Sequence, residues 1–213
     1  MKTIAGLAGY LLAAALSSAA LPVSAADTPQ DGLDAVRQRV AHVEVLRGGF
    51  EQEKRVAGFK NPLRSQGRFL LVRGKGVVWT TLKPFPSEMV VTTERILSVD
   101  AAGNRRVEVD AGQQPALRQI NAMMFALVDG DVSALASRFD IAVQAPPVAA
   151  WSLILTPKTA AVARLFSRIE LRGDRYVREV VMTEAGGDRM ALKFSDLSET
   201  PARLSDDEAK RFE

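Results

Sequence analysis

The chain has 213 residues, with 28 Lys and Arg against 25 Asp and Glu, a single histidine and no cysteine. The basic residues are scattered singly or in pairs, so no nucleic-acid-binding stripe is present and no nucleic-acid partner is expected. The lack of cysteine excludes disulfides, thiol catalysis, thiolate metal sites and a lipid-modified N-terminus.

Residues 1–26 predict a cleaved secretory signal peptide. They combine Lys2, an uncharged run rich in leucine and alanine, and the small-residue pattern Val-Ser-Ala at 23–25. We expect cleavage after residue 25 or 26, and a retained membrane anchor is the alternative. Together with the lack of cysteine, the signal predicts export to the periplasm. Residues 27–213 have the length of one domain, and no further membrane span is expected.

The N-terminal half predicts one helix followed by many strands. Residues 33–46 have helical spacing, and Asp31 is expected to be the N-cap. From Gly48 to Asp110 the apolar period changes to two, with Gly, Pro and Asn at the breaks. Connections this short require antiparallel neighbours. The apolar stripe of the predicted helix consists of Leu33, Val36, Val40 and Val43.

The C-terminal half predicts a helical insertion and then more strands. Residues 115–129 and 132–139 have helical spacing, and 160–166 form a helical turn. Ser205 and Glu208 match a capping box that opens a last helical turn. The chain therefore predicts about ten strands in one meander, interrupted once by helices. The later strands are expected at 139–145, 151–156, 168–176, 177–184 and 190–197, with hairpin turns at Gly173-Asp174 and Gly186-Gly187.

Several predicted strands are apolar on both faces, as at 69–72, 77–79 and 89–91. Three short helices cannot cover a flat sheet of this width, since a strand occupies about 4.8 Å and a helix about 10 Å. We therefore expect a mainly β, α+β fold, in which a strongly curved antiparallel half-barrel sheet carries helices over its concave face. The Met-rich stretch at 123–127 suggests a cavity with a lid, although the same residues equally fit a core.

A set of residues recurs in a recognisable order and spacing: Phe50-Glu51-Gln52, Gly67, Arg73 six positions before Trp79, Lys83-Pro84, and Leu155 to Lys158. In this order and spacing, they resemble the periplasmic lipoprotein carrier LolA and its relatives. The similarity runs from about Val40 to Val99, with a second patch near Leu155. It implies a half-barrel whose hydrophobic cavity takes acyl chains from an inner-membrane exporter and passes them to an outer-membrane acceptor.

The resemblance implies that Arg73 holds the lid by hydrogen bonds to helix carbonyls, a task that suits a guanidinium. An ordinary exposed arginine at a strand end is the alternative. Gly74 stands where the family usually has a proline, and Val77 stands where it often has an aromatic residue. These two departures affect the expected cargo and docking partner more than the fold. The candidate ligand-binding residues are Arg73, Phe50, Phe69, Leu71, Trp79, Met89, Val91, Met123, Met124 and Leu127.

Large aromatic residues fit either a cavity wall or a core, and we favour the core for Trp79, Trp151, Phe85 and Phe125.

Enzymatic roles are disfavoured, and we expect no cofactor and no metal. His42 is the only histidine and is expected on a helix surface, which disfavours both a Ser-His-Asp triad and a multi-histidine metal site.

Glu51 and Glu53 share a strand face and could act as paired carboxylates of a glycoside hydrolase, but surface ion pairs with nearby basic residues are favoured. Three hypotheses remain: a monomeric carrier of acylated cargo, either a lipoprotein or another lipid; an envelope protein-interaction or sensor module; and a carboxylate-dependent hydrolase.

Overall fold

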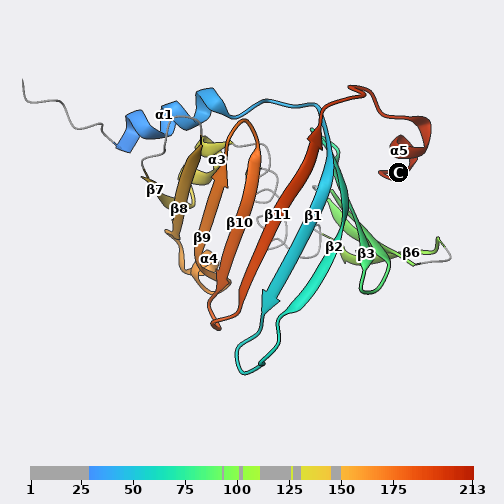
Figure 1. Cartoon of the computed structure of the whole chain (residues 1–213), viewed down its shortest axis with the longest axis horizontal. Helices are drawn as coiled ribbons and strands as arrows, with labels where there is room; N and C mark the ends of the chain where they lie inside the picture. The colour runs from blue at the N-terminus through green and yellow to red at the C-terminus, as the bar shows by residue number, and fades with distance from the viewer. Residues whose placement is uncertain (1–28, 93, 101–102, 111–125, 127–130, 145–149) are drawn as a thin grey trace, which may run out of the picture.

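A computed structural model describes residues 29–92, 94–100, 103–110, 126, 131–144 and 150–213. Its strands form one antiparallel sheet of eleven strands, in the order β6-β5-β4-β3-β2-β1-β11-β10-β9-β8-β7 (Figure 1). The strands are β1 (Val45–Arg55), β2 (Leu63–Val72), β3 (Gly76–Lys83), β4 (Ser87–Thr92), β5 (Arg95–Val99), β6 (Arg105–Asp110), β7 (Phe139–Gln144), β8 (Trp151–Pro157), β9 (Phe166–Gly173), β10 (Val177–Glu184) and β11 (Arg189–Ser198).

The sheet consists of two meanders joined at its centre. Strands β1 to β6 pair in sequence order, β7 to β11 do the same, and β1 pairs with β11. The two strands beside the helical insertion, β6 and β7, therefore form the free edges. The sheet is open and strongly curved (Figure 1), so the predicted mainly β, antiparallel half-barrel is confirmed.

The described helices are short: α1 (Pro29–Arg39), α3 (Val132–Ala136), α4 (Ala160–Ala163) and α5 (Asp206–Lys210). None of the helices in the described part of the chain is long and apolar enough to cross a bilayer. Of the predicted helix at 115–129, only Ala126 belongs to the described residues, where it is helical and buried. The predicted signal peptide, residues 1–26, lies outside them.

The predicted boundaries of the first helix were wrong. Helix α1 already begins at Pro29, so Asp31 lies within it and is not its N-cap. It ends at Arg39, and β1 begins at Val45, inside the stretch expected to be helical. The physical reason is strand pairing, because Val45 is opposite Val72 in the β1–β2 ladder. Val43, the last residue of the predicted helical stripe, is therefore buried against strand residues, including Phe69 and Leu71.

One face of the sheet, called here the inner face, packs against α1, Ala126 and α3. Its main cluster combines Leu33 and Val36 of α1 with apolar side chains of β7 to β11. Trp151 is 2 % exposed and donates from Nε1 to the Asp174 carbonyl at 2.6 Å, so the expected core position of this residue is confirmed. Its strand partners in this cluster include Phe139, Leu153, Leu155, Ile169, Leu171, Val180, Met182 and Leu192.

The opposite, outer face has its own apolar cluster over β1 to β5, formed by Val45, Leu70, Val72, Val78, Val90 and Leu97. Leu204 and Phe212 pack against this cluster. Both belong to the C-terminal segment, defined here as residues 199–213, which contains α5. The strands that were predicted to be apolar on both faces thus have an apolar cluster on the outer face as well, and Leu204 and Phe212 supply part of its cover.

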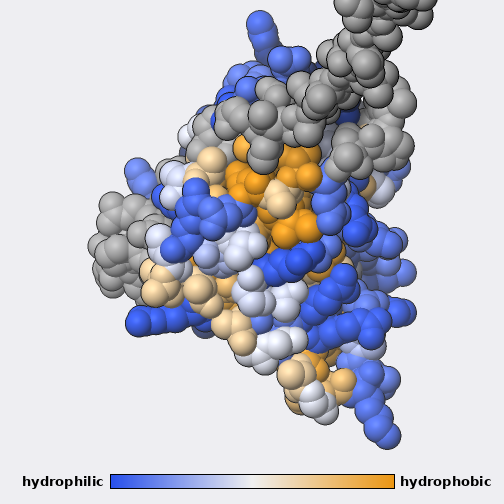
Figure 2. All heavy atoms as spheres, turned by 90° about the vertical axis from the view of Figure 1, so that its left-hand side faces the viewer, coloured by the Kyte–Doolittle hydropathy of each residue, from blue (hydrophilic) through white to orange (hydrophobic). Residues whose placement is uncertain are grey.

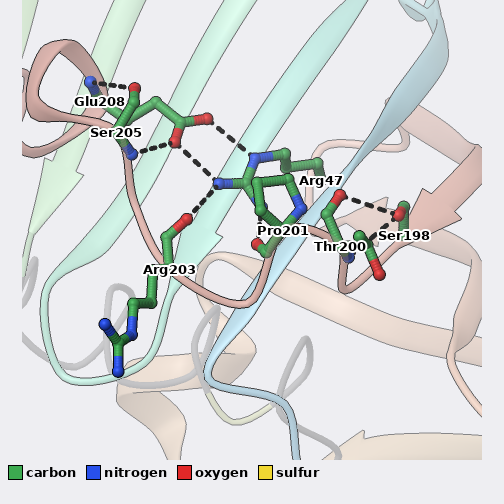
Figure 3. Close-up of polar contacts among 7 residues, drawn as sticks. All are labelled: Arg47, Ser198, Thr200, Pro201, Arg203, Ser205 and Glu208. Atoms are coloured by element: carbon green, nitrogen blue, oxygen red, sulfur yellow. Dashed lines mark hydrogen bonds and ion pairs between the residues drawn. The ribbon is translucent and has the colours of Figure 1, made fainter.

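An ion pair anchors the C-terminal segment to β1 (Figure 3). Arg47 donates from Nε and Nη2 to the two carboxylate oxygens of Glu208 at 2.8 and 2.7 Å, and from Nη1 to the Pro201 carbonyl at 2.6 Å. Ser205 and Glu208 form the predicted capping box. The hydrogen bond from Arg47 outweighs the opposing effect of burial and lowers the pKa of Glu208 to about 2.

Candidate functional site

Four aromatic side chains gather on the inner face, on the adjacent strands β11, β1, β2 and β3. Phe50 stacks on Trp79 with ring centroids 3.9 Å apart, and Phe69 lies 6.2 Å from Trp79. Phe194 meets Phe69 edge to face at 5.3 Å. Phe50 and Phe69 are buried, whereas Trp79 is half-buried. This aromatic cluster, Phe50, Phe69, Trp79 and Phe194, therefore has a closed interior and one partly accessible indole.

Glycines make room for the aromatic cluster. A Cβ at Gly67 would overlap the backbone oxygen of Thr80 and lie 2.8 Å from the Phe50 ring. A Cβ at Gly48 would lie 2.8 Å from the ring of Phe69. The rings thus lie directly over the backbone of neighbouring strands, which only glycine allows at these two positions.

The cluster continues across the sheet through residues that pair with its members. Trp79 is opposite Met89, and Leu71 is opposite Val77, which in turn is opposite Val91. Because directly opposed residues share a face, Leu71, Met89 and Val91 also belong to the inner face. Leu71 and Val91 are buried, but Met89 is 40 % exposed. Among the described residues at this end of the inner face, Trp79 and Met89 therefore contribute accessible apolar surface.

The apolar character extends to the β7 edge of the sheet. Ile141 and Val143 of β7 are partly buried against the main inner cluster. Viewed from this end of the molecule, hydrophobic residues gather in one area that hydrophilic residues border (Figure 2). The inner face is thus apolar from β4 to the β7 edge.

Arg73, at the end of β2, contacts the connection between α1 and β1. Its Nε donates to the carbonyl of Val43 at 3.1 Å, and its backbone nitrogen donates to the carbonyl of Glu44 at 2.9 Å. The side chain is about one third exposed. The acceptor is a carbonyl four residues beyond the end of α1, so Arg73 fastens the chain that leads from this helix into the sheet.

The structure shows which of the candidate ligand-binding residues share one face of the sheet. All six apolar candidates within the described residues share the inner face, whereas Met123, Met124, Leu127 and Phe125 lie outside those residues. Phe194 was missed, although the alternation of Leu192 and Phe194 along the predicted strand could have revealed it. Phe85 is 81 % exposed, so its expected core position was wrong. It sits in the short connection after β3, where no neighbouring strand can cover it.

Of the two glutamates considered for catalysis, Glu53 forms ion pairs with neighbouring arginines. Arg55 and Arg64 both donate to Glu53, and their hydrogen bonds and charges outweigh burial and lower its pKa, which is the opposite of what a general acid needs. His42 is exposed, but in the connection after α1 and not on a helix. No group of metal-ligating side chains occurs among the described residues.

A cavity of about 630 Å³ lies on the outer face beside the C-terminal segment. Its lining includes the charged side chains of Arg47, Glu208 and Arg211, which are already paired, Arg47 with Glu208 at 2.7 Å and Arg211 with Glu88 at 3.3 Å. An acyl chain gains free energy only from apolar walls. The inner face, and not this cavity, is therefore the better candidate for binding an apolar ligand.

The solved structures that are similar to this chain share little of its sequence. No curated protein matched the sequence. A LolA superfamily protein from Nitrosomonas europaea is 11 % identical, covers 88 % of this chain and 98 % of its own, and has a TM-score of 0.44. A DUF1329 family protein from Desulfovibrio piger is 12 % identical, with 88 % and 98 % covered and a TM-score of 0.47. The MucA/MucB complex from Pseudomonas aeruginosa contains a chain that is 17 % identical, with 86 % and 60 % covered and a TM-score of 0.47.

The sequence model described as outer membrane lipoprotein carrier protein LolA matches residues 41–209. This range contains the strands of both meanders, the aromatic cluster and most of the C-terminal segment. The chain therefore belongs to the LolA family.

Proposed function

We propose that this protein is a periplasmic carrier that holds the acyl chains of a lipoprotein or another lipid against its inner face. The observation that carries the proposal is the aromatic cluster of a LolA-family sheet, with Trp79 and Met89 still partly exposed. Each buried methylene contributes about 0.8 kcal/mol, so one or two acyl chains suffice for stable binding. The cargo moves from an inner-membrane exporter to an outer-membrane acceptor, and the mature protein, residues 27–213, acts as a monomer.

In this proposal the helices over the inner face act as the cover of the site. Helix α1 belongs to the inner cluster, and Arg73 holds the connection behind it through the carbonyl of Val43. Cargo release requires this cover to move, which breaks the hydrogen bond. We propose that Met123, Met124 and Leu127 complete the apolar lining, as expected from the sequence. No step of this cycle needs a catalytic group.

A quenching experiment tests where the acyl chain binds. Bromine atoms quench an indole only at short range, and the chain has two tryptophans. A fatty acid brominated along its chain should quench Trp79, which is half-buried, and should leave the 2 % exposed Trp151 unaffected. Replacing Trp79 by phenylalanine should remove the quenching while preserving binding in a native mass spectrum.

A charge on the inner face should prevent binding without unfolding the protein. Met89→Glu places a carboxylate on the accessible apolar surface, and we expect at least tenfold weaker acyl binding, because the charge would have to be desolvated. Val107→Glu is the matched control, since Val107 is 56 % exposed and pairs with Leu97 of the outer cluster. Equal binding by both variants would contradict the proposal.

Protein purified from the periplasm without acyl species would favour an interaction or sensor module instead.

A further inference from the structure

The two most exposed large hydrophobic side chains of the described residues lie in neighbouring hairpin connections. Phe85, in the connection of β3 to β4, is 81 % exposed, and Phe59, in the connection of β1 to β2, is 74 % exposed. Leu63 and Leu82 beside them are 63 % and 41 % exposed. Single apolar side chains on a surface are common, but four around two adjacent connections form a surface that favours an apolar partner.

Both connections open at the same end of the sheet. Strands β2 and β3 are antiparallel neighbours, and Lys83 at the end of β3 is opposite Gln66 near the start of β2. The connection that precedes β2 and the connection that follows β3 therefore project in the same direction. A partner with an extended surface can meet both at once. This end, residues 54–64 and 82–86, is called the hairpin end below.

The hairpin end carries excess positive charge. Its residues include Lys54, Arg55, Lys60, Arg64 and Lys83, and none is acidic. Acids of neighbouring strands pair with part of this charge, since Lys54 lies 2.9 Å from Glu184. Lys60 and Lys83, which flank the two phenylalanines, are exposed and make no ion pair with any other residue in the described part of the chain.

We propose that the hairpin end docks on the surface of an anionic phospholipid bilayer. Phe59 and Phe85 enter the boundary between head groups and acyl chains, while Lys60 and Lys83 lie near the lipid phosphates. Reversible binding to a membrane surface depends on two contributions, apolar side chains that enter the interface and cations that lie near the anionic head groups. This proposal goes beyond carrying cargo, because it concerns the membrane contact and needs no bound acyl chain.

The chain's lack of cysteine allows a direct test. Single variants Phe59→Cys and Phe85→Cys, labelled with an environment-sensitive fluorophore, should show blue-shifted and brighter emission with vesicles of phosphatidylglycerol and phosphatidylethanolamine. Val107→Cys is the control, since this exposed residue lies within edge strand β6 and not at a hairpin connection. We expect no change for the control and none with pure phosphatidylcholine vesicles. An unchanged signal at both hairpin positions would overturn the proposal.

Vesicle flotation separates the two contributions. The double variant Phe59→Ser/Phe85→Ser should bind anionic vesicles at least about tenfold more weakly than the wild type. Lys60→Gln/Lys83→Gln should weaken binding and reduce its dependence on salt. If the Phe variant floats like the wild type but fails to transfer cargo to an acceptor protein, the hairpin end serves a protein partner and the membrane proposal is wrong.

The acyl content of the same samples distinguishes this proposal from the proposed function. Both double variants should retain bound acyl species in native mass spectra, because neither changes the inner face. Vesicle binding without bound acyl species would support the membrane contact and count against the carrier function. Bound acyl species without vesicle binding would support the carrier function and refute the membrane contact.

Discussion

Neutralising Glu208 should weaken the attachment of the C-terminal segment. The bidentate pair with Arg47 lowers the pKa of Glu208 from its usual 4.5 to about 2, which corresponds to at most about 3 kcal/mol of stabilisation at neutral pH. About a quarter of the Glu208 side chain is exposed, so solvent screens the pair. We therefore expect Glu208→Gln to lower the free energy of unfolding by about 1 to 2 kcal/mol at pH 7.

The pH dependence follows from the sign of this pKa change. Because folding lowers the pKa, the stabilisation is fully present above pH 4.5 and is lost as the pH falls through about 2. Urea unfolding of wild type and Glu208→Gln between pH 7 and pH 2 should therefore give curves that converge as the pH decreases. Asp207→Asn is the matched control, since Asp207 is exposed in the same first turn of α5. This substitution should leave the pH dependence of the free energy of unfolding as it is in the wild type.

The segment can also detach without global unfolding, which amide hydrogen exchange in α5 would detect. Faster exchange there in Glu208→Gln, with unchanged exchange in β8 and β9, would locate the effect in the C-terminal segment. Wild type and variant curves that stay parallel from pH 7 to pH 2, together with unchanged α5 exchange, would refute the reasoning.

Two further substitutions test the inner face and its cover. Gly67→Ala should destabilise the protein by about 2 to 3 kcal/mol in urea unfolding, because the new Cβ overlaps the Thr80 backbone oxygen. Gly186→Ala, where no atom lies within 4 Å, should change stability little, and equal effects would contradict the packing account. Arg73→Leu removes the hydrogen bond to the Val43 carbonyl, so the cover should open more readily and the variant should release its cargo, and transfer it to an acceptor, faster than the wild type. Unchanged transfer would remove Arg73 from the mechanism.

The contrast between Trp79 and Phe85 shows the limits of sequence reasoning at the candidate site. Both are aromatic residues in or beside apolar strands, and the same reasoning placed both in the core. Trp79 is opposite Phe69 and Met89 and joins the aromatic cluster, whereas Phe85 lies beyond the end of β3, where no strand partner covers it. Burial depends on which neighbours the sheet provides, and that information is absent from local composition.

Local sequence by itself determined the period-two strands, the short connections and therefore an antiparallel meander, because these depend on neighbouring residues. It also determined the capping box, which Ser205 and Glu208, three positions apart, specify together. Only the tertiary structure decided that β1 pairs with β11, that the C-terminal segment covers the outer face through Arg47 and Glu208, and that Phe194 joins the aromatic cluster. These contacts join residues more than 100 positions apart, and their formation depends on the register and curvature of the whole sheet.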